Sequence, residues 1–261
     1  MRKALIIFLK YDKNGTKHIF PNGNTLYAGS LNPFSQMYND DGIEWNEFKL
    51  IKYRNLRSYS RDISEFYNIE NELVKYRIIS IKLYSKFRFV LNTIMERIKN
   101  LVFPYDTSIN LKRIESPKKR KIRTAGNAIN YKNQQNLTVR NYGMKPVYFV
   151  NLMKYREIAQ YPDGYEGKQI SGKKAGRIYN RVANKVNRKF KNYVKFIGVP
   201  QNTIADNTGT EINWDSFALV KYANIKSILK FAQDKAFQKA LDHKDAAIDQ
   251  TYVYASFNKN E

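Results

Sequence analysis

The side chains that most often perform chemistry are scarce in this chain of 261 residues. It contains no cysteine and only two histidines, His18 and His243. Thiol nucleophiles, disulfides and thiolate metal sites are therefore excluded, and two histidines cannot form a His-rich metal centre. The sequence also lacks a Gly-rich phosphate loop and the GxSxG and HExxH motifs. We expect no metal site, and neither a cofactor nor a reaction can be identified.

His243 is the one histidine placed among carboxylates, because Asp242 and Asp245 lie beside it. A histidine near a carboxylate can act as a general base. On a helix, which the apolar spacing of this segment predicts, such groups more often point to solvent. His243 is therefore a candidate catalytic residue with a structural alternative.

The strand expected at residues 147–155 (VYFVNLMKY) carries two further candidates, Asn151 and Tyr155. Alternation of side chains along a strand places both on one face. Asn151 is the only amide in an apolar strand, so a buried Asn151 needs hydrogen-bond partners from a ligand or from neighbouring protein groups. Both residues are candidates for catalysis and ligand binding. Other aromatic residues would either line the same ligand site or pack in the core: Trp214, Tyr222, Tyr11, Trp45 and Tyr53.

Positive charge is the strongest feature of the composition, with a formal net charge of +23. Residues 86–145 hold 14 Lys and Arg against three acidic residues. Such a block suits contact with nucleic acid or another polyanion, although a biased composition rich in Lys, Asn and Ile would produce it as well. A second group is spaced three or four residues apart, as on one helix face. The candidate polyanion-binding residues are Lys118, Lys119, Arg120, Lys121, Lys174, Arg177, Arg181, Lys185 and Arg188.

Residues 146–261 show the element order βαββαβ. Strands are expected at 147–155, 193–197, 214–222 and 251–255. One helix begins after Ser171, a favourable N-cap residue, and the other begins at Asn224 or Ser227. This order is that of a ferredoxin-like α+β domain, in which two helices cover one face of an antiparallel sheet.

Several segments of this region occur in a recognisable order: VNLMKYRE, YPDG, SGKKAGRIY, WDSFALVKY and FQKALDHK. They resemble domain-of-unknown-function family 1330 over residues 145–256. That family belongs to the dimeric α/β-barrel superfamily, so the resemblance implies two sheets that face each other around a cavity. The wider superfamily includes small monooxygenases, isomerases and haem enzymes, but the resemblance implies no particular activity here.

The N-terminal part repeats features of the C-terminal part. The segments GIEWNEFKLIKY (42–53) and EINWDSFALVKY (211–222) share Trp, Phe, Lys and Tyr at an offset of 169 residues. Asn55 and Ser58 match Asn224 and Ser227 at the same offset, and the segment FPNG (20–23) resembles YPDG (161–164). The first helix is missing from the N-terminal copy. A helix expected at 87–102 is proposed to cover the sheet face left open.

The expected organisation follows from this duplication. Residues 1–85 form a degenerate ferredoxin-like copy, 86–103 the covering helix, 104–145 a basic linker and 146–261 the complete domain. The two tandem domains would form an intrachain pseudo-dimeric α/β barrel, with further homo-oligomerisation left open. The apolar start is too short for a signal peptide, and no stretch approaches the roughly 20 apolar residues of a membrane span. We therefore expect a cytoplasmic protein with no membrane partner.

Three functions agree with this organisation. The first is binding or conversion of a small molecule in a cavity between the two sheets. The second is binding of nucleic acid or another polyanion through the basic central segment and the basic helix face. The third is a structural module without a cavity. The sequence does not decide whether the protein is an enzyme.

Overall fold

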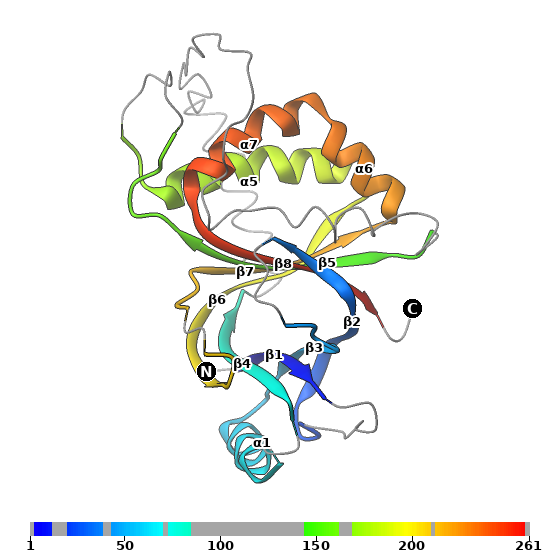
Figure 1. The fold of residues 1–261 in the computed structure, drawn as a ribbon, viewed down its shortest axis with the longest axis vertical. Coiled ribbons are helices and arrows are strands. Elements are labelled where there is room, and N and C mark those ends of the chain that lie inside the picture. The colour runs from blue at the N-terminus through cyan, green and yellow to red at the C-terminus, as the bar shows by residue number, and fades with distance from the viewer. Residues whose placement is uncertain are drawn as a thin grey trace.

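The computed structural model describes residues 3–11, 20–38, 43–69, 73–84, 144–161, 169–209 and 212–258. Within them, eight strands form one closed antiparallel barrel in the order β1-β3-β2-β8-β5-β7-β6-β4. This barrel confirms the predicted α+β fold, with two ferredoxin-like sheets joined in one chain (Figure 1). The strands are β1 (Ala4–Lys10), β2 (Asn24–Tyr38), β3 (Glu47–Lys52), β4 (Lys75–Leu83), β5 (Val147–Tyr155), β6 (Tyr193–Asp206), β7 (Ser216–Tyr222) and β8 (Ile248–Asn258).

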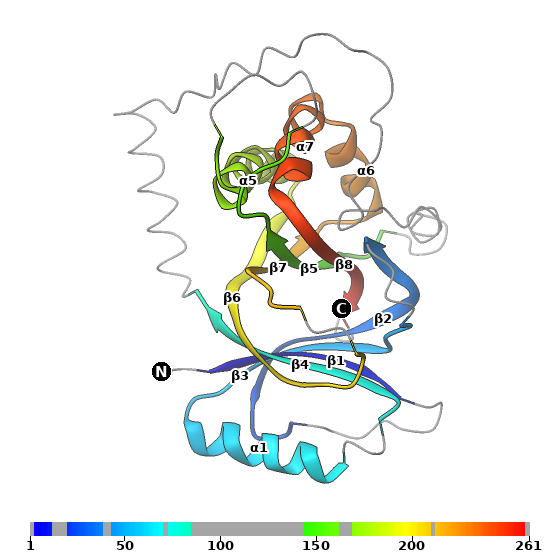
Figure 2. The ribbon, with the colours of Figure 1, turned by 60° about the vertical axis from the view of Figure 1, so that its left-hand side comes forward.

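The helices lie outside the barrel, at its two opposite ends (Figure 1). The N-terminal half carries one described helix, α1 (Leu56–Ile69), whose Phe66 packs with Leu5, Ile7 and Ile51. The C-terminal half carries α5 (Gly172–Lys189), α6 (Ile225–Gln233) and α7 (Lys235–Ala247). These three helices form a layer over the sheet of β5–β8, as the second view shows (Figure 2). None of the described helices combines the length and hydrophobicity needed to cross a membrane.

Two long strands join the halves by changing partners along their length. The first part of β2 pairs with β3, and residues from Gly29 onward pair with β8. The first part of β6 pairs with β7, and residues from Gly198 onward pair with β4. Gly29 and Gly198 are separated by the same 169 residues as Trp45 and Trp214. The duplication therefore extends to the strands that close the barrel.

Both glycines lie where strands approach closely. A Cβ atom at Gly198 would lie 2.7 Å from Cδ1 of Ile81 and 2.9 Å from the carbonyl oxygen of Lys82. A Cβ atom at Gly29 would overlap Oγ of Ser256. Because real side chains do not tolerate such contacts, these positions require glycine for close approach of the strands.

Helix caps and core residues also match between the halves. Asn55 Oδ1 accepts a hydrogen bond of 2.8 Å from the Ser58 amide, and Asn224 Oδ1 accepts one of 2.9 Å from the Ser227 amide. The predicted start of the second helix at Asn224 is thus confirmed. The predicted match between FPNG and YPDG stays a prediction, because residues 162–164 lie outside the described part of the chain. Phe20 lies just before β2, and β2 corresponds to β6 at the offset of 169 residues. The residues that the first copy lacks therefore fall between β1 and β2.

The space between the two sheets is filled by side chains of the described strands. The aromatic rings of Phe48 and Phe217, which the duplication relates, lie across the barrel from each other with centroids 6.4 Å apart. A ligand chamber was expected here, and the described side chains between the sheets form an aromatic and aliphatic core. Its buried members include Ile6, Phe8, Trp45, Phe48, Leu50, Ile79, Tyr148, Val150, Leu152, Trp214, Phe217, Leu219, Tyr252 and Tyr254.

Some expected elements differ in extent, and others lie outside the described residues. β6 continues past Pro200 because this part of the strand pairs with β4. It no longer pairs with β7, so a proline without an amide hydrogen is tolerated there. The second helix of the domain is divided at Asp234, whose Oδ1 accepts a hydrogen bond of 2.9 Å from the Ala236 amide and caps α7. The helix expected at 87–102 and the linker at 104–145 fall outside the described residues, apart from 144 and 145.

Candidate ligand-binding site

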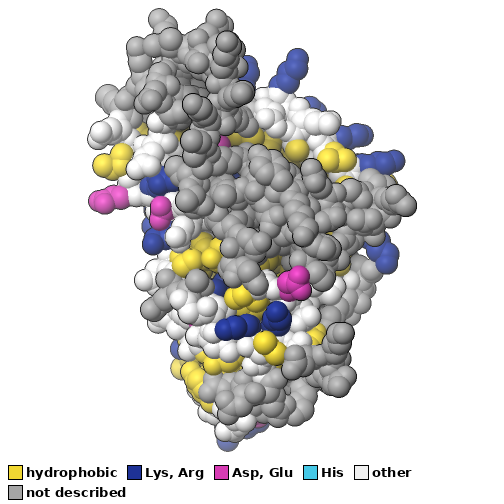
Figure 3. Space-filling view, in the orientation of Figure 1, with side chains coloured by type: hydrophobic (Ala, Val, Ile, Leu, Met, Phe, Trp, Pro, Cys, Tyr) yellow, Lys and Arg dark blue, Asp and Glu magenta, His cyan; other side chains and the backbone are white. Residues whose placement is uncertain are grey.

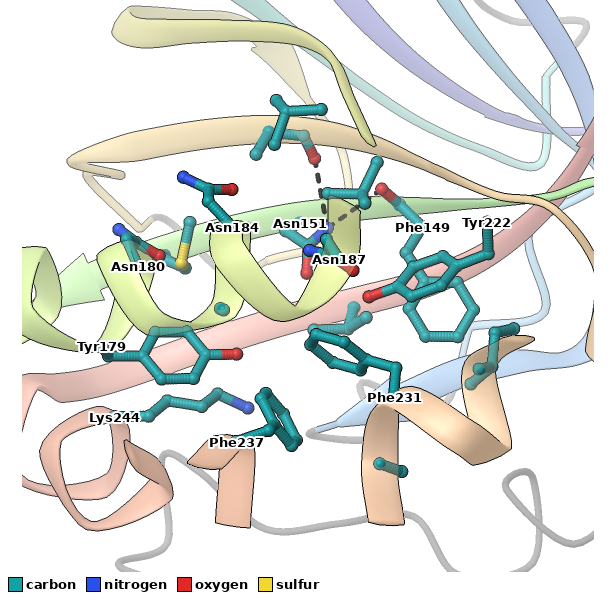
Figure 4. Close-up of a pocket in the computed structure, with 18 of the residues that line it drawn as sticks. Phe149, Asn151, Tyr179, Asn180, Asn184, Asn187, Tyr222, Phe231, Phe237 and Lys244 are labelled. Atoms are coloured by element: carbon teal, nitrogen blue, oxygen red, sulfur yellow. Dashed lines mark hydrogen bonds between the residues drawn. The ribbon is translucent and has the colours of Figure 1, made fainter. Parts of the chain in front are cut away.

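A cavity of about 260 Å³ lies between the helical layer and the outer face of the C-terminal sheet (Figure 4). This volume is close to the lower end of small-molecule pockets, which begin at roughly 300 Å³. Side chains of β5–β8 form one wall, and side chains of α5, α6 and α7 form the other. The cavity is therefore enclosed by elements of the C-terminal half alone.

Glycines hold the first turns of α5 close to β5. A Cβ atom at Gly176 would lie 2.7 Å from Cε1 of Tyr155, and one at Gly172 would overlap the carbonyl oxygen of Arg156. The start of α5 is fixed further by Ser171, whose Oγ accepts a hydrogen bond of 3.3 Å from the Lys174 amide. The sequence favours this N-cap, which the structure confirms. Further along α5, the side chains that face the sheet line the cavity.

Aromatic rings form much of the apolar wall. Phe231 contacts Phe237 with ring centroids 4.0 Å apart and Tyr222 with centroids 5.8 Å apart. Tyr222 in turn packs against Phe149 at 4.8 Å, and Tyr179 lies 6.0 Å from Phe237. These rings present flat apolar surface on which a ring or a branched aliphatic group can pack.

Four asparagines place amide groups in this apolar cavity. Asn180, Asn184 and Asn187 follow one another on the sheet-facing side of α5, and Asn151 extends from β5 (Figure 4). Asn151 Nδ2 donates hydrogen bonds to the carbonyl oxygens of Phe149 at 2.9 Å and of Ala218 at 3.2 Å. The nitrogen of its amide is thus satisfied by backbone, as one of the two interpretations of this residue expects.

Asn187 differs from the other amides because its oxygen is buried without a partner. The residue is 5% exposed, and Oδ1 has no hydrogen bond within the described part of the chain. A buried polar atom left without a hydrogen bond costs about 1–3 kcal/mol. A ligand with a hydrogen-bond donor would remove this cost.

Lys244 is the only charged residue among the described side chains that line the cavity. It is 8% exposed and extends from α7 between Tyr179 and Phe237 (Figure 4). A lysine ammonium donates three hydrogen bonds and accepts none. The cavity thus combines apolar walls, amides and a single positive charge.

The structure divides the predicted ligand-binding aromatic residues among several places. Tyr222 and Asn151 line the cavity, and Tyr155 is packed at the start of α5 in an apolar cluster with Ala175. Burial raises the pKa of the Tyr155 hydroxyl. Trp214 lies inside the barrel against Tyr252, with ring centroids 5.1 Å apart.

The N-terminal counterparts lie in the other half. Trp45 is inside the barrel against Phe8, with ring centroids 5.6 Å apart. Tyr53 packs beneath α1, where its hydroxyl donates a hydrogen bond of 2.8 Å to Oδ2 of Asp62, and Tyr11 borders the same cluster. Burial, followed by this hydrogen bond, raises the pKa of the Tyr53 hydroxyl. The seven predicted residues therefore do not form one site.

His243 is outside the residues that line the cavity. Its Nδ1 lies 2.8 Å from the hydroxyl oxygen of Tyr161, and the tautomer of the ring sets which of the two groups donates this hydrogen bond. Burial lowers the pKa of His243 against the opposing effect of Asp242. Burial also raises the pKa of Tyr161 to about 12, with a smaller contribution from Asp242. We expected this histidine to point to solvent, but it is half-buried and paired with Tyr161.

The basic residues predicted on the first helix of the domain lie along the outer side of α5. Lys174, Arg177, Lys185 and Arg188 are exposed, and Arg181 is partly buried. Figure 3 shows Lys and Arg side chains along the helical end of one face of the molecule. The other predicted group, Lys118, Lys119, Arg120 and Lys121, lies outside the described residues.

Asn180, Asn184, Asn187 and Lys244 were not among the predicted site residues. The signal for the asparagines is their spacing of four and three residues on one helix, on the side that also carries Ala183. Lys244 has no comparable signal, because a lysine on a helix is ordinarily exposed. Its burial results from the way α7 packs against α5.

Comparisons with known proteins identify no family. No protein-family model matches this chain, and no curated protein matches it. The resemblance to domain-of-unknown-function family 1330 therefore stays a prediction.

Several solved structures are similar to this chain at low identity. A protein of unknown function from Rhodopseudomonas palustris is 21% identical over 44% of this chain and 84% of its own, with a TM-score of 0.40. A protein from Fusobacterium nucleatum, provisionally described as a monooxygenase, is 8% identical over 98% of this chain and 92% of its own, with a TM-score of 0.45. Chlorite dismutase from Candidatus Nitrospira defluvii, in complex with imidazole, is 10% identical over 98% and 90%, with a TM-score of 0.44.

Similarities at this level do not bear on activity, cofactor or substrate. The strand order and the position of the helices are those of a dimeric α/β barrel, in which both ferredoxin-like sheets come from one chain.

Proposed function

We propose that this protein binds a small, mainly apolar molecule in the cavity between the sheet and helices α5, α6 and α7. The observation that carries the proposal is a cavity of about 260 Å³ whose apolar wall contains the unsatisfied Oδ1 of Asn187. Apolar cavities that are merely packing defects gain nothing from a buried amide, whereas binding sites use a few placed polar groups for orientation.

The proposed site differs from the chamber expected between the two sheets. Side chains alternate along β5, so Tyr148, Val150 and Leu152 fill the barrel interior while Phe149 and Asn151 face the helices. The cavity on the helical side retains open volume and polar groups. Small-molecule binding therefore keeps its support, with the site moved to the other face of the sheet.

A cavity-filling substitution tests this proposal. Ala183 lines the cavity and is 6% exposed, so Ala183→Phe would occupy space that the ligand needs. Ala236→Phe on the exposed side of α7 is the matched control. Ligand-observed NMR with benzamide and hexanamide as probes should detect binding to the natural protein and to the control, but not to Ala183→Phe.

Two safeguards make the test decisive. Thermal melting shows whether each variant is folded, and Asn184→Phe at a partly buried position provides a second way to fill the cavity. Binding that persists in both filled variants would contradict the proposed location. Absence of binding to the natural protein by any member of a wider set of small neutral molecules would contradict the function.

A second function is favoured by the exposed basic residues of α5. Lys174, Arg177, Lys185 and Arg188 form a positive stripe that could follow a phosphate backbone. Replacing the four residues by serine should weaken binding of a single-stranded oligonucleotide and reduce the salt dependence of the affinity. An unchanged salt dependence would exclude this stripe as the binding surface.

A further inference from the structure

We infer that the cavity takes an uncharged molecule with a planar NH2 group, as in a primary carboxamide, which donates one hydrogen bond to Asn151 and one to Asn187. This inference rests on the proposed function and adds the chemical class of the ligand. The juxtaposition that carries it is a pair of amide oxygens from the two walls of one apolar cavity, with Asn151 on β5 and Asn187 on α5 (Figure 4).

The orientation of the Asn151 amide is fixed by the backbone. Its Nδ2 lies 2.9 Å from the carbonyl oxygen of Phe149 and 3.2 Å from that of Ala218. Rotating the amide by half a turn would place Oδ1 against these two acceptors, so the observed orientation is the favourable one. Both hydrogens of Nδ2 are used in these bonds. Asn151 can therefore offer a ligand only its acceptor, Oδ1.

Asn187 also provides an acceptor, and this residue is more deeply buried. It is 5% exposed, and its Oδ1 has no hydrogen bond within the described part of the chain. Its backbone carbonyl accepts hydrogen bonds from the amides of Phe190 at 3.1 Å and Asn192 at 2.8 Å. The end of α5 thus fixes the backbone at Asn187, while the side-chain oxygen lacks a donor that a ligand can supply.

The donor that suits these oxygens is uncharged. The described residues that line the cavity include no Asp or Glu. A protonated amine would lose its water on entering the cavity without meeting an opposite charge there, which is costly. A primary carboxamide carries its NH2 hydrogens without a positive charge, so it avoids this cost.

The number of acceptors favours NH2 over a hydroxyl group. A hydroxyl has one hydrogen to donate, whereas a planar NH2 group donates two in different directions. A ketone or an ether donates none and would leave both oxygens without a hydrogen bond. Phe231, Phe237 and Tyr222 offer apolar surface for the rest of the ligand.

Matched pairs of amides and ketones test the inference. Benzamide with acetophenone, and hexanamide with 2-heptanone, have nearly the same shape, because a methyl group replaces NH2. Titrations followed by NMR should show each amide binding the natural protein roughly 25-fold more tightly than its ketone, since each of the two hydrogen bonds contributes about fivefold. Equal affinities for amide and ketone would overturn the inference and leave the proposed function standing.

N-methylbenzamide tests whether two hydrogen bonds are made. It has a single N–H group, and propiophenone is the ketone of matching shape. N-methylbenzamide should bind only about fivefold more tightly than propiophenone. A ratio as large as that between benzamide and acetophenone would overturn the arrangement with two acceptors.

Variants then assign one of the hydrogen bonds to Asn187. Asn187→Leu should reduce the ratio between benzamide and acetophenone to about fivefold, whereas Asn202→Leu at an exposed position of β6 should keep it. Thermal melting shows whether each variant is folded, and Asn187→Met takes the place of Asn187→Leu if the latter is not. An unchanged ratio in the Asn187 variant would refute the assignment. Failure of every amide and ketone, and of the wider neutral set, would count against the proposed function itself.

Discussion

The barrel interior should behave as a core, so truncation of Phe48 should destabilise the whole protein. Phe48 is fully buried, and its ring contacts Phe8 with centroids 5.2 Å apart, Tyr27 at 5.7 Å and Phe217 at 6.4 Å. Phe8 and Tyr27 belong to the same half, whereas Phe217 belongs to the other. Phe48→Ala therefore removes contacts within one sheet and across the barrel.

The expected loss follows from similar changes in protein cores. Replacing a fully buried phenylalanine by alanine lowers the free energy of unfolding by about 3–5 kcal/mol. For a chain of this size, each kcal/mol lowers the melting temperature by roughly 2–4 °C, so a decrease of about 10 °C is expected. Because Phe48 joins the two halves, the transition should remain single and move as a whole.

Thermal melting followed by circular dichroism measures both quantities. Tyr193→Ala is the control, since Tyr193 is a large aromatic residue that is 49% exposed, and its truncation should change stability by no more than about 0.5 kcal/mol. A Phe48→Ala melting temperature within experimental error of the natural protein would refute the packed interior. A second, separate transition would refute the single cooperative barrel.

Three further outcomes follow from the closed strands, the cavity and the Tyr–His pair. Gly198→Ala should lower the free energy of unfolding by about 1–3 kcal/mol, because the new methyl group meets the carbonyl oxygen of Lys82; urea unfolding measures it, and unchanged stability would contradict the close strand approach. Asn187→Leu should raise the free energy of unfolding by about 1 kcal/mol while weakening binding of hydroxy-substituted benzamides, since it removes an unsatisfied buried acceptor; lower stability together with unchanged binding would contradict its assigned role. Burial lowers the pKa of His243 below its ordinary 6.5, so the unfolded chain binds more protons than the folded protein in the interval between the lowered pKa and 6.5. The stability that the neutral ring contributes is present above pH 6.5 and is lost as the pH falls through that interval; urea unfolding at a series of pH values should show a shallower loss in His243→Gln, and an identical pH dependence would exclude this origin.

Periodicity and capping residues made much of the fold predictable. The alternating segment at 147–155 predicted β5 with its bounds as observed, and Ser171 and Asn224 cap the helices that follow them. Repetition of Trp45 and Phe48 at Trp214 and Phe217 indicated two related sheets. These signals are local or repeated in the sequence, so they can be read without knowing the tertiary contacts.

The way in which the strands close the barrel could not be predicted in the same way. β6 was expected to end at Ile197, and its second part forms a strand because it pairs with β4. The equivalent strand β2 was not predicted at all. Partner changes at Gly29 and Gly198 depend on residues far away in the sequence, and a single glycine has many local explanations.

The candidate site shows the same limit. Alternation along β5 correctly separated Phe149 and Asn151 from Tyr148 and Val150, but alternation does not tell which face meets helices. Whether side chains fill the space between two sheets depends on their combined volume and packing. The sequence named Asn151 and Tyr222, which line the cavity, as binding candidates, and it predicted the chamber between the two sheets.

A crystal structure of the protein with bound benzamide tests the central claim most directly. The account predicts ligand density between β5–β8 and helices α5, α6 and α7, with the ring of the ligand against Phe231. It also predicts a barrel interior filled by Phe48 and Phe217. Ligand density inside the barrel, next to Trp45 and Trp214, would contradict the account.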